Sequence, residues 1–115
     1  MPHICIRIKD YEKYAERLGK SLPKLCEIVG QHFSENPAYV SAEVVRQSEL
    51  CLHRKEIDIE VEASPDADGT RAAMAGELAT ALVAFITTKV LPESPQPTVS
   101  AWVRIFDAAA YLCNE

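Results

Sequence analysis

The sequence contains an internal repeat, and this repeat constrains the fold more than any other feature. Residues 35–46 read ENPAYVSAEVVR and residues 93–104 read ESPQPTVSAWVR. The tripeptide Val-Ser-Ala occurs in both segments, starting at Val40 and at Val99, and a Glu-x-Pro turn signal precedes each copy. A chain that carries the same segment twice is expected to build the same structural unit twice.

Strand-like segments lie upstream of both copies. Residues 4–8 read ICIRI and residues 57–61 read IDIEV, so that isoleucine or valine occupies every second position. This alternation is typical of a strand with one buried face. Each half of the chain therefore begins with one predicted strand and ends with another.

A helix is expected between the two strands of the first half, from about residue 11 to residue 29. Its apolar residues are spaced four, three and four positions apart, which places them on one helix face: Leu18, Leu22, Leu25 and Val29. Pro23 lacks a backbone donor and is expected to kink or divide this helix, with Ser21 capping the second piece. Gly30 is the expected C-terminal stop.

A second helix is expected from about residue 70 to residue 88. Asp66, Asp68 and Gly69 form a turn and N-cap region before it, and its many alanines favour a helix and allow close packing. The expected apolar stripe of this helix consists of Ala75, Leu78, Leu82 and Phe85.

The order β-α-β, short link, β-α-β predicts an α/β (α+β) two-layer sandwich. Crossover helices imply parallel strands within each unit, and right-handed connections place both helices on one face of a four-stranded mixed sheet. We expect a single domain, residues 1–115, with pseudo-repeats at 1–49 and 54–107. The opposite sheet face is expected to be apolar enough to be buried against another copy, which predicts a homo-oligomer. On the strands at 4–8 and 57–61 that face is expected to display His3, Cys5, Arg7, Asp58 and Glu60. On the other pair of strands, Val44-Val45 and Trp102-Val103 leave few polar positions.

Composition narrows the possible partners. The net charge is −5 and the twelve Lys and Arg are dispersed, which argues against nucleic acid. We expect no membrane partner, because charges at Lys9 and Asp10 interrupt any signal-peptide core and residues 79–90 are too few to span a bilayer. The four cysteines lack Cys-x-x-Cys spacing and are read as reduced, mostly buried thiols of a cytoplasmic protein. The scattered histidines indicate no metal site.

Several motifs together resemble one known family. The chain opens with MPH, and longer motifs are NPAYVSAEVV at 36–45, DGTRAAMAGELATALVAFI at 68–86 and VSAWVRIFDAAAYL at 99–112. With the doubled β-α-β unit, these resemble the long-subunit members of the tautomerase superfamily, 5-carboxymethyl-2-hydroxymuconate isomerase and macrophage migration inhibitory factor. The resemblance implies a homotrimer whose catalytic base is the N-terminal proline, here Pro2, exposed when Met1 is removed.

The chain also departs from those relatives. The lysine that follows the first helix in the inhibitory factor has no counterpart, and Glu35 or Asn36 stands nearby. The second catalytic arginine of the isomerase falls on residues 66–68, which are not basic. These differences leave the substrate open.

The chemistry expected of Pro2 is general base catalysis without a cofactor. A free α-amino group titrates at about 8, and burial or a nearby arginine lowers that value toward neutrality. Such a base can move a proton between carbon and oxygen in a small 2-oxo or 2-hydroxy-dienoic carboxylic acid, which interconverts keto and enol forms.

An arginine is expected to bind the substrate carboxylate, because its planar fork suits a carboxylate and a developing enolate. The candidates are Arg46, Arg104 and Arg7, with Trp102 sharing a face with Arg104 as a pocket wall. The resemblance places Trp102 and Arg104 where the inhibitory factor has pocket residues from a neighbouring subunit. Each arginine could instead be a surface or ion-paired residue, and the tryptophan could simply pack in an interface.

Two alternatives remain at this stage. The same fold could serve as a non-enzymatic trimeric binding module. A ferredoxin-like regulatory sandwich could also follow a β-α-β-β-α-β order.

Overall fold

The computed structural model describes residues 2–48 and 55–106. The first repeat forms β1 (His3–Ile8), α1 (Tyr11–Phe33), a short 3₁₀ turn η1 (Pro37–Tyr39) and β2 (Ser41–Arg46). The second repeat forms β3 (Ile57–Ala63), α2 (Thr70–Phe85), a π-helical turn η2 (Ile86–Val90) and β4 (Val99–Ile105). The predicted doubled β-α-β order is confirmed.

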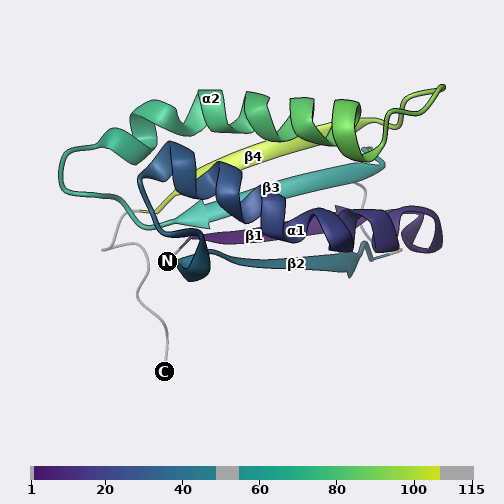
Figure 1. Ribbon diagram of the computed structural model, residues 1–115, viewed down its shortest axis with the longest axis horizontal. Helices are drawn as coiled ribbons and strands as arrows, with labels where there is room; N and C mark the ends of the chain where they lie inside the picture. Colours follow the sequence, from purple (N-terminus) through teal and green to yellow (C-terminus); the bar gives the residue numbers. More distant parts are fainter. Residues whose placement is uncertain (1, 49–54, 107–115) are drawn as a thin grey trace.

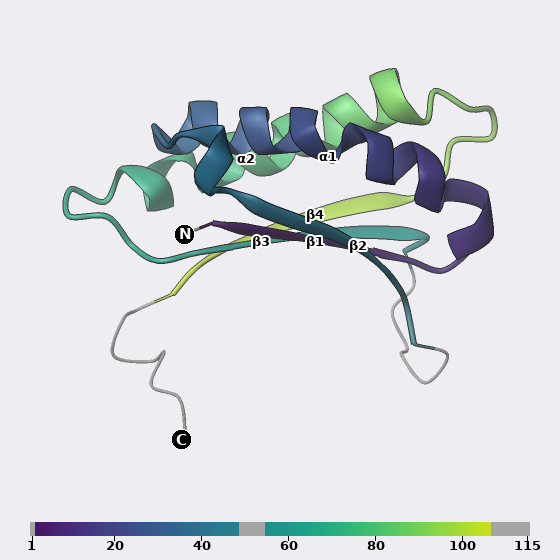
Figure 2. The ribbon, with the colours of Figure 1, turned by 60° about the horizontal axis from the view of Figure 1, so that its bottom comes forward.

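The strands form one four-stranded mixed sheet in the order β2-β1-β3-β4. The pairs within each repeat are parallel, and the central strands β1 and β3 are antiparallel, with Ile6 opposite Ile59. Both helices cover the same face of the sheet (Figures 1 and 2). In a ferredoxin-like sandwich another strand separates the two strands of each β-α-β unit, whereas here they are direct neighbours, so that alternative is wrong.

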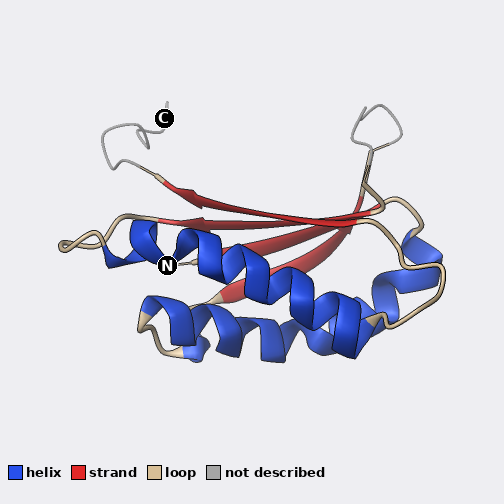
Figure 3. Cartoon of the chain, turned by 90° about the horizontal axis from the view of Figure 1, so that it is seen from above, coloured by secondary structure: helices blue, strands red, loops and turns tan. Residues whose placement is uncertain are grey.

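The core lies between the sheet and the two helices (Figure 3). Alternate residues of the central strands point into it, and those at Ile4, Ile6, Ile8, Ile57, Ile59 and Val61 are fully buried. The helices contribute Leu18 and Leu25 from α1 and Leu78 and Leu82 from α2, all fully buried. Burying one such aliphatic side chain is worth about 1.5–3 kcal/mol, which fixes the register of both repeats.

The uncovered face of the sheet is polar, contrary to the expectation of an apolar second face. The predicted members His3, Cys5, Arg7 and Glu60 are there and partly exposed. The apolar residues of the outer strands divide between the faces, because β2 and β4 alternate as well. Ala42 and Val44 pack against the core cluster, as do Val99, Ala101 and Val103 of β4. The expectation that the uncovered face needs another copy to hide apolar area therefore loses its original basis.

Helix α1 differs from its prediction at two positions. It passes through Pro23 as one helix, and Ser21 does not cap a second piece, because its hydroxyl donates to the carbonyl of Leu18 at 2.7 Å. It also continues beyond Gly30, ending at Phe33. The glycine is needed for a different reason: a Cβ there would lie 2.6 Å from the carbonyl oxygen of Glu35, which folds back over the helix.

Helix α2 begins where predicted, and side chains before it bind its first N–H groups. The Asp68 carboxylate accepts from the backbone and hydroxyl of Thr70 (3.2 and 2.7 Å), and the Asp66 carboxylate accepts from the backbone of Arg71. With η2 the helical stretch runs over Thr70–Val90, 21 residues, and is long and apolar enough to cross a membrane by length and composition alone. The sequence estimate of an apolar stretch at residues 79–90 was therefore too short.

The buried face of α2 also shifts slightly from the expected stripe. Leu78 and Leu82 are buried as predicted, and Ile86 of η2 continues the row. Ala75 and Phe85 are only partly buried. The helix packs through a narrower stripe than expected, which leaves much of its surface uncovered.

Candidate active site at the N-terminal proline

Pro2 stands immediately before β1 and is buried. Its carbonyl accepts a hydrogen bond from the backbone of Ser41 at 3.1 Å, which starts the pairing of β1 with β2. Proline has no N–H to contribute to a strand, so nothing is lost at this terminal position. Pro2 follows the alternation of Ile4 and Ile6 and so belongs to the face of the sheet that the helices cover.

Segments from both repeats meet at this end of the sheet. His3 is opposite Glu62, so Ser64, just after β3, lies across from the start of the chain. Helix α1 ends here, and η1 leads into β2 beside the N-terminus (Figure 1). Tyr39 of η1 is 56% exposed and is one of two large hydrophobic side chains exposed among the described residues.

Arg71 is the enclosed cation at this end, and sequence reasoning did not select it. Its side chain is only 12% exposed and lies between the two repeats. One terminal nitrogen donates to the Ser64 carbonyl at 2.9 Å, and the other to Glu35 Oε2 at 3.1 Å. The guanidinium also lies 5.5 Å from the centre of the Phe33 ring. These contacts fix the orientation of the Arg71 guanidinium group. Three of its five N–H donors have no partner among the described residues.

The sequence contained one signal for this residue. Arg71 lies in the TRAAMAGEL stretch that carries the family resemblance, but it is the second residue of a helix, where a solvated side chain is the ordinary expectation. Its partner Glu35 was noted only as part of the Glu-x-Pro signal and as one of two residues, with Asn36, near the position of the missing lysine. The pair joins residues 36 positions apart, and only the folded arrangement reveals it.

Arg7 and Arg104 lie on the uncovered face, joined through one carboxylate. Glu60 on β3 accepts from Arg7 at 2.6 Å through Oε2 and pairs with Arg104 Nε at 3.1 Å through Oε1. Asp58 lies 3.8 Å from Arg7 and accepts from the Ser100 hydroxyl at 2.7 Å. The hydrogen bond that Arg7 donates to Glu60 raises the pKa of Arg7 above its already high ordinary value. Both arginines thus have an ion-pair partner within their own subunit.

Arg46 lies at the other end of the sheet from Pro2. It is opposite Ile8, six positions along β1 from Pro2, which is about 20 Å at the rise of a strand. Its guanidinium binds Glu12 at 2.6 and 3.2 Å and lies 4.7 Å from the centre of the Tyr11 ring. The hydrogen bond from Arg46 lowers the pKa of Glu12. Within one subunit Arg46 does not belong to a site at Pro2.

Trp102 shares the uncovered face with Arg104, as predicted, and is 57% exposed. Strand β4 is an edge strand, two strands from β1, so Trp102 lies about 10 Å to the side of β1. Trp102 and Arg104 therefore cannot wall the Pro2 site of their own subunit. They face outward at a sheet edge, where a neighbouring molecule could receive them.

A cluster of polar side chains on β1 and β2 lies next to Pro2. The His3 ring contacts the Ser41 hydroxyl at 2.7 Å and Glu43 at 3.3 Å. Cys5 is half-buried beside them, and its burial raises the pKa of the thiol, which keeps it from being a ready nucleophile. Within residues 2–48 and 55–106, no three His, Cys, Asp or Glu side chains are grouped to hold a metal ion.

Comparison with solved structures identifies the fold. A macrophage migration inhibitory factor-like protein from Entamoeba histolytica matches with a TM-score of 0.57 at 12% identity, over 99% of this chain and 96% of that one. A fused 4-oxalocrotonate tautomerase, a symmetric trimer, matches with a TM-score of 0.57 at 15% identity, over 91% and 85%. Pt0534, in a structure inactivated by 2-oxo-3-pentynoate, matches at 0.54 and 16% identity, over 98% and 91%.

The fold is therefore the doubled β-α-β fold of tautomerases and inhibitory factor-like proteins. No protein-family model matches the sequence, and no curated protein is significantly similar to it.

Proposed function

We propose that the chain, after removal of Met1, is a cytoplasmic homotrimeric tautomerase that uses the amine of Pro2 as a general base. Its substrate is a small 2-oxo or 2-hydroxy-dienoic carboxylic acid, interconverted between keto and enol forms. The observation that carries the proposal is the placement of Pro2, buried, at the same end of the sheet as the enclosed Arg71. The fold shared with a 4-oxalocrotonate tautomerase supports it.

Burial suits Pro2 for this role. Removing Met1 leaves a secondary amine on a rigid ring, and a free α-amino group has a pKa of about 8. A buried position disfavours the protonated amine and brings its pKa toward neutrality, as does the positive charge of a nearby arginine. The neutral amine takes a proton from one atom of the substrate and returns it to another.

Arg71 supplies the cation for the carboxylate in this proposal. Its contacts with Ser64 and Glu35 hold the guanidinium in one orientation before any substrate arrives. A pre-oriented fork with unused donors can bind a carboxylate through two hydrogen bonds and can stabilise negative charge that develops on an enolate. In this chain Arg71 takes the part expected of the lysine that has no counterpart here.

The arginines selected from the sequence act, in this proposal, across subunit boundaries. Arg104 uses only Nε for its ion pair, so its two terminal nitrogens have no partner among the described residues. Together with Trp102 it would reach the Pro2 site of a neighbouring subunit in a trimer. Arg7, in contact with both Glu60 and Asp58, is assigned to holding the sheet face together, and Arg46 to fixing the start of α1.

The test uses untagged protein and follows ketonisation of an enol such as phenylenolpyruvate. The mass of the purified chain should lack Met1, and Pro2→Ala should lower kcat/KM by at least about 100-fold, the contribution of a positioned base. A chain with an N-terminal extension should be equally inactive, whereas a C-terminal tag should be tolerated. Treatment with 2-oxo-3-pentynoate should add one adduct, mapped to Pro2. Normal turnover by Pro2→Ala would reject the mechanism.

A non-enzymatic binding module is the second candidate, and one observation favours it. Arg7, Arg71 and Arg104 are each already paired with a glutamate of the same subunit. If those pairs persist, a carboxylate ligand would be held without turnover. Calorimetry with phenylpyruvate separates the two functions, because the module predicts binding that Pro2→Ala leaves unchanged.

A further inference from the structure

The cation proposed to bind the substrate carboxylate has an anion beside it. Arg71 Nη2 donates to Glu35 Oε2 at 3.1 Å, and the Glu35 side chain is 28% exposed, so that solvent reaches it. The other carboxylate oxygen, Oε1, accepts from the backbone of Asn36 at 3.3 Å. The backbone of Glu35 is fixed to the end of α1, because its N–H donates to the Gly30 carbonyl at 2.9 Å. Glu35 is thus held next to Arg71 through its backbone and through both oxygens.

Arg71 is the only lysine or arginine that the described residues place at the Pro2 end on the helix-covered side of the sheet. In α1 the last one is Lys24, about 14 Å from the end of the helix at the rise of an α-helix. In α2 and η2 the next one after Arg71 is Lys89, about 27 Å farther along the helical stretch. Strand β3 and the turn at residues 64–69 have none. Those of the other strands lie on the uncovered face or at the other end of the sheet.

The start of α2 adds negative charge rather than a free anion site. The Asp68 carboxylate accepts from the backbone of Thr70 at 3.2 Å, and the Asp66 carboxylate accepts from the backbone of Arg71 at 3.2 Å. The N–H groups at a helix start ordinarily attract anions, but here two side chains of the same subunit already bind them. Counting Glu35, three carboxylates at this end therefore stand against one guanidinium group.

The arginine that a neighbouring subunit is proposed to supply changes this balance by one charge. With Arg104 beside the site, two guanidinium groups and the Glu35 carboxylate face the substrate, which leaves one positive charge. One carboxylate neutralises that charge. A second carboxylate on the same small substrate would have no cation of its own and would lie within a Debye length of Glu35, in a partly buried site where like charges repel more strongly than in water.

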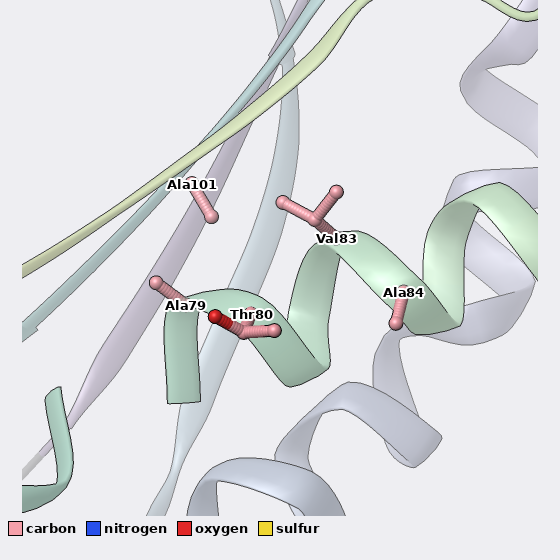
Figure 4. A pocket seen from close by; sticks show the side chains of 5 residues that line it. All are labelled: Ala79, Thr80, Val83, Ala84 and Ala101. Carbon is pink, nitrogen blue, oxygen red and sulfur yellow. The ribbon is translucent and has the colours of Figure 1, made fainter. Parts of the chain in front are cut away.

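The open pocket between α2 and β4 is not an alternative site for a carboxylate (Figure 4). Its lining has no charged side chain and consists of Ala79, Thr80, Val83, Ala84 and Ala101. The one polar side chain among them is that of Thr80, whose hydroxyl donates to the Gly76 carbonyl at 3.0 Å. A carboxylate without a cation or several N–H donors would lose its hydration there without compensation. Among the described residues, recognition of an acid therefore depends on the charges around Arg71.

We propose that the site at Pro2 accepts acids with a single carboxylate and discriminates against dicarboxylates, and that Glu35 sets this preference. The carboxylate of the substrate binds N–H donors of Arg71 that Ser64 and Glu35 leave unused. The rest of the substrate is uncharged, because the Glu35 carboxylate lowers the affinity for any second anion. This inference rests on the proposed function, whose substrate class it narrows.

A selecting role and a merely structural role of Glu35 predict different kinetics. A glutamate that only orients Arg71 would, when replaced, impair all carboxylate substrates by the same factor. A glutamate that selects by charge changes the ratio of kcat/KM between an acid with one carboxylate and an acid with two. The ratio is therefore the quantity to measure.

The experiment compares 2-hydroxy-2,4-pentadienoate with 2-hydroxymuconate, which is the same dienol with a second carboxylate at its far end. Glu35→Gln keeps the size of the side chain and an acceptor for Arg71 but removes the charge. It should shift the kcat/KM ratio toward the dicarboxylate by at least about 10-fold relative to wild type. The matched control Glu93→Gln removes the same charge from the pair with Arg17 at the other end of the molecule and should leave the ratio unchanged.

A binding measurement separates this inference from the proposed function. Calorimetry uses 2-oxopentanoate and 2-oxopentanedioate, which have the same five carbons and require no turnover. Wild-type protein should bind the monocarboxylate at least about 10-fold more tightly, and Glu35→Gln should narrow this difference. The same binding preference in a protein that converts neither dienol would reject the tautomerase and retain the charge selection by Glu35.

Three results would overturn the inference. One is wild-type protein that binds the dicarboxylate as tightly as the monocarboxylate, a result that also decides the matter if Glu35→Gln does not fold. Another is an unchanged kcat/KM ratio in Glu35→Gln when circular dichroism shows that the variant is folded, since Glu35 would then only orient Arg71. The third is binding of neither acid, which would remove the proposed function as well.

Discussion

The two ends of the molecule contain the same contact in two different environments. Each repeat places an arginine of its helix against the glutamate of the Glu-x-Pro segment in the other repeat: Arg71 with Glu35 and Arg17 with Glu93. The first pair lies at the Pro2 end, with side chains 12% and 28% exposed. The second lies at the opposite end, with side chains 44% and 27% exposed.

The difference lies in what surrounds each arginine. Arg71 also binds the Ser64 carbonyl and lies near the Phe33 ring, so it is held on several sides. Besides Glu93, Arg17 has the Tyr14 ring at 5.8 Å, and its side chain is 44% exposed. A doubled fold thus produces the same cross-repeat ion pair twice, and the copy beside Pro2 is the more enclosed of the two. The proposed function relies on this difference between the two repeats.

Removing one partner of each pair should give the largest contrast. Arg71→Met leaves Glu35 partly buried without its cation and should lower the free energy of unfolding by about 3 kcal/mol, at the lower end for a buried pair. Arg17→Met removes an exposed pair and should cost less than about 1 kcal/mol. Urea denaturation measures both. Equal losses would show that the two ends are equivalent and would remove the reason for assigning Arg71 to a site.

Substituting two glycines of α1 should sharpen the contrast along that helix. Gly30→Ala, at the Pro2 end, puts a Cβ 2.6 Å from the Glu35 carbonyl oxygen and should cost about 1–3 kcal/mol. Gly19→Ala, in open space farther from that end, should stabilise the helix by about 0.5–1 kcal/mol. Thermal unfolding of both variants tests this. A neutral Gly30→Ala would mean that the loop over the helix moves without cost.

The smallest expected effect is on the loss of stability at low pH. The Thr70 hydroxyl lowers the pKa of Asp68 from its ordinary value near 3.8. Because the folded-state pKa is depressed, the carboxylate stabilises the fold above about pH 4, and this contribution is lost as pH falls through the folded-state value. The free energy of unfolding of Asp68→Asn should therefore fall less steeply than that of the wild type as the pH drops below about 4. A pH profile of Asp68→Asn identical to that of the wild type would contradict the assignment.

The fold was predictable because its signals are local and occur twice. Isoleucines at every second position of β1 and β3, and the spacing of Leu18 and Leu25, lead directly to strands and a helix with one buried side. The extent of α1 was not predictable, because the need for Gly30 comes from a loop carbonyl that only the folded chain brings close. Pro23 was expected to kink or divide this helix, and α1 continues through it as one helix.

Of the residues that a subunit contributes to its own proposed site, only Pro2 had been selected from the sequence. Pro2 can be recognised from its position in the sequence. The role of an arginine, in contrast, depends on which side chain the fold places beside it. Arg7 and Arg104 share the carboxylate of Glu60 because β3 lies between their strands, and this order of strands cannot be read from any single motif. Arg71 finds Glu35 across the two repeats.

The bridging position of Glu60 has an evolutionary consequence. Its one carboxylate holds Arg7 and Arg104 from the strands on either side. A substitution such as Glu60→Gln would release Arg104 and leave Arg7 with Asp58 at 3.8 Å, within the part of the chain that the structure describes. The guanidinium group of Arg104 would then become available on the uncovered face through a single change. A lineage with this fold could thus acquire an anion-binding surface in one mutational step, without altering the core or the site at the proline.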